Sequence, residues 1–125
     1  MDDANGWFEE AEHNLELAEI MAQHQEYAMA CFLCQQAVEM ALKALLLFQK
    51  NEFPKTHSLR ELASKAGVFS QVKELIALLE EDYTSARYFD AAGKHTWEAY
   101  DEERFERRFP SAKEALELIK KWIND

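Results

Sequence analysis

The chain has 125 residues, with 24 acidic and 14 basic side chains, a formal net charge of −10 and only two cysteines. This acidity argues against sequence-independent binding to nucleic acid through a broad basic surface. Two cysteines make no disulfide framework and the acidic N-terminus lacks the apolar stretch of a signal peptide, so we expect a reducing, cytoplasmic location.

The composition favours helix throughout. Ala, Leu, Glu and Lys dominate, and there are only three glycines and two prolines. The charge is unevenly placed, because residues 1–42 hold nine acidic side chains and no Lys or Arg, whereas residues 43–73 hold six basic and two acidic ones. A local basic face is therefore an alternative to an ordinary solvated surface.

The first helix is predicted to begin near Asp3–Asn5, which offer capping side chains, and to end around 24–26. Its predicted buried stripe repeats at three to four residues: Trp7, Ala11, Asn14, Leu15, Ala18, Met21 and Ala22. The next helix follows almost at once, so we expect the two to pack as an antiparallel hairpin.

The stretch from Tyr27 to Lys50 is predicted to be the central helix of a bundle, because it is apolar around most of its circumference. Its longest unbroken apolar run has 8 residues, from Tyr27 to Cys34. That is far short of the roughly 20 that a membrane span needs, so we expect a core helix and no membrane partner.

Most polar residues of the central helix fall within one arc of about 100°. The arc consists of Gln35, Gln36, Glu39 and Lys43, joined by Gln25 and Lys50. An i,i+4 pair between Glu39 and Lys43 contributes only a few tenths of a kcal/mol on a solvated helix. The stripe therefore either faces solvent at a seam or lines a cleft or a dimer contact.

The second half of the chain is predicted to hold shorter helices. Asn51–Pro54 ends the central helix, and Ser58 with Glu61 forms a capping box for a short helix over 59–66 that stops at Gly67, with His57 just outside it. Ser70 caps a fourth helix that fades around 87–89. Its inner stripe is Val72, Leu75, Ile76, Leu79, Tyr83 and Ala86.

Residues 90–100 are predicted to form a loop, and the last helix is predicted to start afresh near Pro110 after a short helical turn in 102–108. Its buried stripe is Phe105, Phe109, Ala112, Leu116, Ile119 and Ile123. The fold class is thus all-α, an up-and-down bundle of four main helices plus a short extra one, in a single domain over residues 1–125.

Two motifs resemble metal or redox sites. Glu10-x-x-His13 has the spacing of carboxylate-bridged di-iron helices but lacks a second copy, and Cys31-x-x-Cys34 lies inside an apolar helix without a strand beside it. We therefore expect no metal site and no cofactor, with the two cysteines as small buried side chains.

The segment 82–90 (DYTSARYFD) is a candidate for binding. Arg87 supplies a planar donor fork, and Tyr83, Tyr88 and Phe89 supply stacking surfaces, a combination that suits a phosphate with a base. The structural alternative is that Tyr88 and Phe89 cover the end of the bundle.

The block from Gln35 to Leu46 (QQAVEMALKALL) resembles the central helix of HEPN domains, the higher eukaryotes and prokaryotes nucleotide-binding family. Trp7 with Ala11, then 56–59 (THSL), then 86–88 (ARY) recur in the order of that family, so the resemblance covers nearly the whole chain.

The resemblance implies a helical bundle that often forms a homodimer. Many members are encoded beside minimal nucleotidyltransferases in toxin–antitoxin-like pairs, and others are metal-independent RNases with an Arg-x4-6-His motif at a dimer cleft. In those enzymes Arg stabilises the phosphate and His transfers a proton. Here seven residues separate Arg87 from His95, one more than the motif permits.

Our leading hypothesis from the sequence is a HEPN-type protein that binds a nucleotide, RNA or a minimal nucleotidyltransferase partner, with Lys43, His57, Arg87 and Tyr88 as ligand contacts. The alternatives are an endoribonuclease that uses Arg87 and His95 as catalytic residues, and a non-catalytic interaction bundle.

Overall fold

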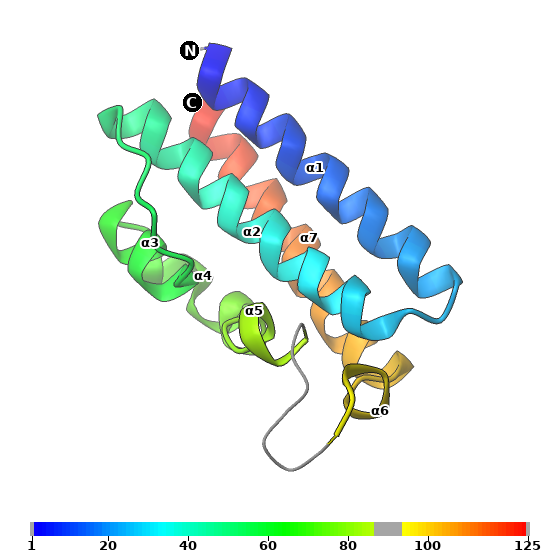
Figure 1. Cartoon of the computed structure of the whole chain (residues 1–125). Helices are drawn as coiled ribbons and strands as arrows, with labels where there is room; N and C mark the ends of the chain where they lie inside the picture. The colour runs from blue at the N-terminus through cyan, green and yellow to red at the C-terminus, as the bar shows by residue number, and fades with distance from the viewer. Residues whose placement is uncertain (1, 87–93, 125) are drawn as a thin grey trace.

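The computed structural model describes residues 2–86 and 94–124, and its axis is the central helix α2 (Tyr27–Lys50). Helices α1 (Asp2–Gln23) and α7 (Glu102–Asn124) lie along α2 (Figure 1). Three of the four short helices lie on the other side of α2, and the fourth lies near the end of α2 that begins at Tyr27. Seven helices and no strand occur in these residues, so the predicted all-α bundle is confirmed.

Helices α1 and α2 form the antiparallel hairpin that the sequence predicts. Gln25 turns the chain with a φ of 63°, and the amide of Glu26 donates to the carbonyl of Met21 at 2.9 Å. Ala11 and Ala18 are fully buried, and such small side chains let helices approach closely. Trp7 departs from the predicted stripe, because it is partly exposed and lies against Phe53.

Helix α2 meets the length and composition criteria for a membrane-spanning helix, and it alone does so in the described part of the chain. However, 67% of the window that meets them is buried within the bundle. Its apolar side chains pack against neighbours on several sides, as the sequence predicts for a core helix.

Helix α3 (Leu59–Lys65) begins where the sequence places it, since the Ser58 side chain accepts a hydrogen bond from the amide of Glu61 at 3.1 Å. The second half of the predicted capping box is wrong. The amide of Ser58 donates to the Thr56 hydroxyl instead, at 3.1 Å. Beyond the helix, Gly67 adopts a φ of 74°.

The predicted fourth helix is wrong in its start and its length. Helix α4 (Phe69–Ile76) has Val68 at its N-cap and no side-chain cap, a turn covers 77–81, and α5 (Asp82–Ser85) follows as a separate short helix. The stripe is nevertheless buried at Val72, Ile76 and Leu79. The break keeps these side chains in the core while Asp82 reaches buried partners on other helices.

The last third of the chain also differs from prediction. A short helix, α6 (Thr96–Ala99), lies within the expected loop, and α7 runs without a break through Pro110, so the predicted fresh start is wrong. The missing amide of Pro110 costs one hydrogen bond, but Phe105 and Phe109 before it and Ala112 after it all pack on the core. Packing on both sides of the proline holds one helix.

Candidate functional site

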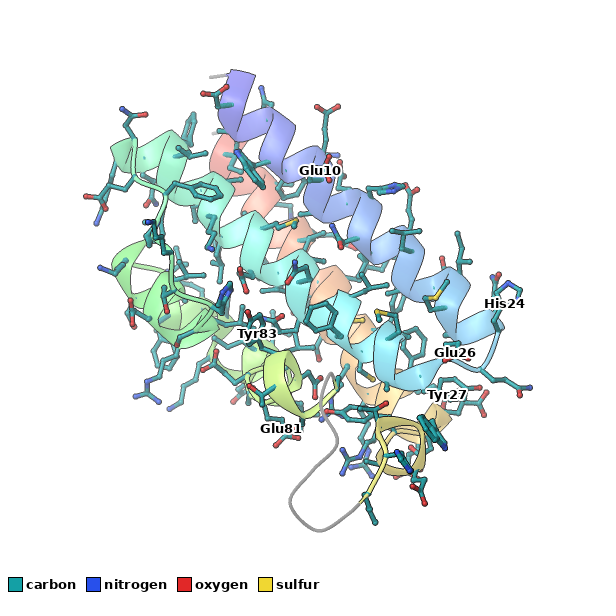
Figure 2. All side chains as sticks on the ribbon, viewed as in Figure 1. Glu10, His24, Glu26, Tyr27, Glu81 and Tyr83 are labelled. Atoms are coloured by element: carbon teal, nitrogen blue, oxygen red, sulfur yellow. The ribbon has the colours of Figure 1, made fainter. Side chains whose placement is uncertain are left out.

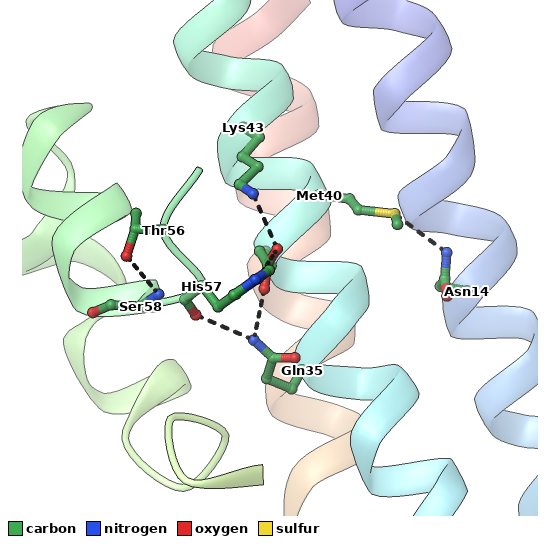
Figure 3. A network of polar contacts seen from close by, with 8 residues as sticks. Asn14, Gln35, Met40, Lys43, Thr56, His57 and Ser58 are labelled. Carbon is green, nitrogen blue, oxygen red and sulfur yellow. Dashed lines mark hydrogen bonds and ion pairs between the residues drawn. The ribbon is translucent and has the colours of Figure 1, made fainter. Parts of the chain in front are cut away.

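The segment 51–58 runs beside α2 and places His57 next to the polar arc of the central helix (Figure 3). Asn51 ends α2 in a left-handed conformation with a φ of 56°, and Ser58 begins α3. The side-chain nitrogen Nε2 of Gln35 donates a long hydrogen bond of 3.4 Å to the backbone carbonyl of His57, which joins the segment to α2. The segment thus adds His57 to the polar side chains on one face of α2, and together they form a cluster.

Glu39 is the centre of this cluster and has three partners. Its Oε2 accepts from Lys43 Nζ at 3.1 Å and contacts His57 Nδ1 at 3.0 Å, and its Oε1 accepts from Gln35 Nε2 at 3.1 Å. The Glu39 and Lys43 side chains are only 6% and 8% exposed. The solvated alternative for the stripe is therefore wrong at Gln35, Glu39 and Lys43, while Gln25 and Lys50 are exposed.

Aromatic rings cover the buried ammonium group. Lys43 Nζ lies 5.3 Å from the centroid of the Phe53 ring, which in turn lies 4.6 Å from that of Trp7. An ion pair removed from water in this way loses several kcal/mol of hydration per ion, which the pair and its hydrogen bonds must offset. The stability of α2 by itself does not require this buried pair of Glu39 and Lys43.

The His57 ring is the one part of the cluster that reaches the surface to a large extent, with 47% of its side chain exposed. It stacks on Tyr83 of α5 with 4.1 Å between centroids and an angle of 15°. The sequence predicts Tyr83 as an inner-stripe residue, and it is half-buried. A positioned imidazole beside an aromatic ring can donate or accept hydrogen bonds and move a proton.

Arg87 and Tyr88 lie outside the described residues. His95, the other residue of the Arg–His pair, precedes α6 and stacks on Trp97 at 4.3 Å between centroids. Its amide donates to the Glu98 carboxylate at 3.0 Å. His95 also lines a cavity of about 280 Å³ with several polar neighbours: Glu81, Ser85, Lys94, Thr96, Tyr100 and Arg104, with Ala99.

Sequence reasoning missed a second buried network, which joins α5, α6 and α7. The Asp82 carboxylate accepts from the Tyr100 hydroxyl at 2.6 Å and from Arg108 Nε at 2.5 Å, and Arg108 Nη2 donates to Glu81 at 3.1 Å. Burial raises the pKa of Asp82 above its ordinary value. The sequence contains one sign of this network, because the charged Arg108 falls beside Phe105 and Phe109 on the apolar stripe of α7.

Cys31 and Cys34 are buried free thiols, as predicted. Burial raises the pKa of Cys31 to about 12 and raises the pKa of Cys34 as well, so neither forms a thiolate readily. In residues 2–86 and 94–124, no group of three or more His, Cys, Asp and Glu side chains is placed to hold a metal ion.

The fold and this arrangement of polar groups define a known class of helical domain. The chain belongs to the HEPN domain family, whose model matches residues 4–122. This confirms the resemblance carried by the central helix.

Two solved structures are similar over almost their whole length. TT1696 from Thermus thermophilus is 30% identical, with a TM-score of 0.88 over 98% of this chain and 99% of that one. ST0689, described as an archaeal HEPN homologue, is also 30% identical, with a TM-score of 0.82 over 96% and 97% of the two chains. A search of curated proteins found no match.

Proposed function

We propose that this HEPN-domain protein binds a nucleotide or RNA at the surface where His57 and Tyr83 meet. One observation carries the proposal: a buried carboxylate, Glu39, holds an imidazole that is 47% exposed. Surface histidines in general need no such support, because solvent satisfies them. An imidazole held in a fixed orientation is suited to binding a ligand from outside the protein.

Arg87 and Tyr88 supply the remaining contacts in this proposal. They follow α5 directly in the sequence, four and five residues after Tyr83. A guanidinium suits a phosphate through paired hydrogen bonds, and a tyrosine ring suits a base through stacking. Lys43 acts indirectly, since its ammonium group pairs with Glu39 and positions it.

A second candidate is an endoribonuclease that uses Arg87 and His95. The cavity beside His95 favours it, because Lys94 and Arg104 line that cavity and are cations suited to a phosphodiester. In such a reaction the histidine transfers a proton of the 2′-hydroxyl while Arg87 stabilises the charged phosphate. The seven-residue spacing makes catalysis the less favoured of the two functions.

The biological unit that we propose is a single-domain, cytoplasmic homodimer that acts with a minimal nucleotidyltransferase in a toxin–antitoxin-like pair. Exposed apolar side chains support a protein contact, since Trp97 is 69% exposed and lines the same surface cavity as Met29, which is 45% exposed. A non-catalytic interaction bundle would need these contacts alone, with Arg87 unimportant.

The test is binding of the four ribonucleoside monophosphates and a mixed-sequence RNA, measured by calorimetry. His57→Ala should weaken binding about three- to tenfold, and Arg87→Ala should weaken it at least tenfold, about 1.4 kcal/mol. His24→Ala is the matched control, because His24 is exposed at the end of α1 away from Tyr83 (Figure 2). Absence of saturable binding by the wild type would rule the proposal out.

The ribonuclease alternative makes a separate prediction. RNA incubated with the wild type in EDTA should be cut, and Arg87→Ala or His95→Ala should each abolish cutting. Intact RNA with the wild type would reject catalysis and leave the binding proposal standing. Sedimentation of the protein alone, and of the protein with a purified minimal nucleotidyltransferase, tests the proposed assembly.

A further inference from the structure

The contact between Glu39 and His57 selects one protonation form of the imidazole. Glu39 Oε2 lies 3.0 Å from Nδ1, and a carboxylate accepts hydrogen bonds, so Nδ1 carries the proton. In the neutral ring the other nitrogen, Nε2, then has a lone pair and acts as an acceptor. A buried carboxylate thus makes the ring edge of a half-exposed histidine a hydrogen-bond acceptor.

The charges around the ring balance one another. Among the described residues, Glu39 from α2 contacts the His57 ring, Tyr83 from α5 stacks on it, and Lys43 pairs with the same oxygen of Glu39. Lys43 therefore neutralises the one charged group that contacts the ring. The surroundings of a neutral His57 therefore do not attract a phosphate, and they suit an uncharged donor.

We propose that His57 Nε2 accepts a hydrogen bond from the ribose 2′-hydroxyl, so that the site prefers ribonucleotides to 2′-deoxyribonucleotides. Tyr83 already covers one face of the imidazole, and the edge that carries Nε2 is the part of the ring that can accept a hydrogen bond. A sugar hydroxyl is the uncharged donor that every ribonucleotide carries, whatever its base. The inference rests on the proposed function and names the part of the ligand that His57 contacts.

The protonation form is tested on the protein alone. The nitrogen chemical shifts of a 15N-labelled imidazole distinguish Nδ1–H from Nε2–H. In the neutral form of the ring we expect His57 to show a protonated Nδ1 and an unprotonated Nε2, with Glu39→Gln shifting the ring toward a mixture. A wild-type ring protonated at Nε2 would overturn the inference, whether or not a ligand binds.

Ligand preference is tested with ribonucleoside monophosphates and their 2′-deoxy and 3′-deoxy forms. Removing the 2′-hydroxyl should weaken binding about three- to tenfold, as expected for one hydrogen bond. His57→Ala should abolish the difference between the sugars by weakening only ribonucleotide binding, and His24→Ala should preserve it. Equal affinity for all three sugars overturns the inference alone, whereas no binding of any of them defeats the proposed function as well.

A pH series separates the hydroxyl contact from a phosphate contact. In acid the imidazole gains a second proton and Nε2 becomes a donor. If His57 accepts from ribose, the preference for ribonucleotides disappears in the samples whose NMR signals show both ring nitrogens protonated. If affinity for all three sugars instead rises in those samples, His57 binds phosphate and the inference is wrong.

Discussion

The hydroxyl of Tyr100 donates to the buried carboxylate of Asp82 at 2.6 Å, which ties the residue after α6 to the first residue of α5. Both residues are almost completely buried. Arg108 holds the second oxygen of the same carboxylate. Three helices therefore meet at one acidic group that has no access to water.

We expect Tyr100→Phe to lower the free energy of unfolding by about 1–2 kcal/mol, because one buried carboxylate oxygen loses its donor. Urea unfolding followed by circular dichroism measures the change. Tyr27→Phe is the matched control, since the half-buried Tyr27 ring packs against Phe105 in the same region. Equal losses in the two variants would contradict the assigned importance of the bond.

Asp82 should give the protein a specific dependence of stability on pH. Burial raises the pKa of its carboxyl above the ordinary 3.8, although the hydrogen bond from Tyr100 and the charge of Arg108 act in the opposite direction. The native state then binds this proton more tightly than the unfolded chain does. Stability is therefore lost as the pH rises through the window immediately above 3.8.

The Asp82→Asn variant isolates that contribution, because a carboxamide does not ionise. Its free energy of unfolding, subtracted from that of the wild type at each pH, should show the wild type losing stability relative to the variant as the pH rises. Urea midpoints across the window supply the numbers. A difference with the opposite slope would mean that Arg108 and Tyr100 lower the pKa of Asp82 by more than burial raises it.

Lys43→Met should destabilise the protein by about 3 kcal/mol, since it leaves the Glu39 carboxylate buried without its cation. Lys73→Met on α4 changes an exposed side chain and should alter stability by less than about 0.5 kcal/mol. Adding Glu39→Gln to Lys43→Met should recover part of the loss. The prediction fails if the two lysine variants unfold at the same urea concentration.

The two cysteines should resist thiol reagents while the protein is folded. Burial raises the pKa of Cys31 to about 12 and also raises that of Cys34, so at about pH 8 the reactive thiolate is scarce as well as covered. Ellman's reagent should detect neither thiol in buffer and both in denaturant. Rapid labelling of the native protein would show that this part of α2 opens readily.

The sequence predicts the long helices well, because an apolar stripe with helical period survives in each of them. Both ends of α2, Tyr27 and Lys50, are confirmed. Two of the failures, a broken fourth helix and an unbroken last one, lie on either side of the bond between Asp82 and Arg108. Local helix propensity cannot predict that long-range pair, because the pair forms only when α5 packs near α7.

The candidate site is predictable only in part. The polar arc on one face of α2 singles out Gln35, Glu39 and Lys43 from the sequence alone, since helical spacing puts them together. The contact of Glu39 with His57 depends on the path of the non-helical segment 51–58 beside α2, which no periodic pattern encodes. The overlooked clue in the sequence is Arg108, a charged residue at a core position of α7.

Glu80 caps α3 from outside it. Its Oε1 accepts from the amide of Leu59 at 2.5 Å and from that of Arg60 at 3.1 Å. A seven-residue helix is too short to persist by itself in water, so α3 depends on a carboxylate some twenty positions downstream. Residues 59–80 should therefore acquire their structure in a single cooperative step, and the refolding of α3 should keep pace with the docking of the turn that follows α4.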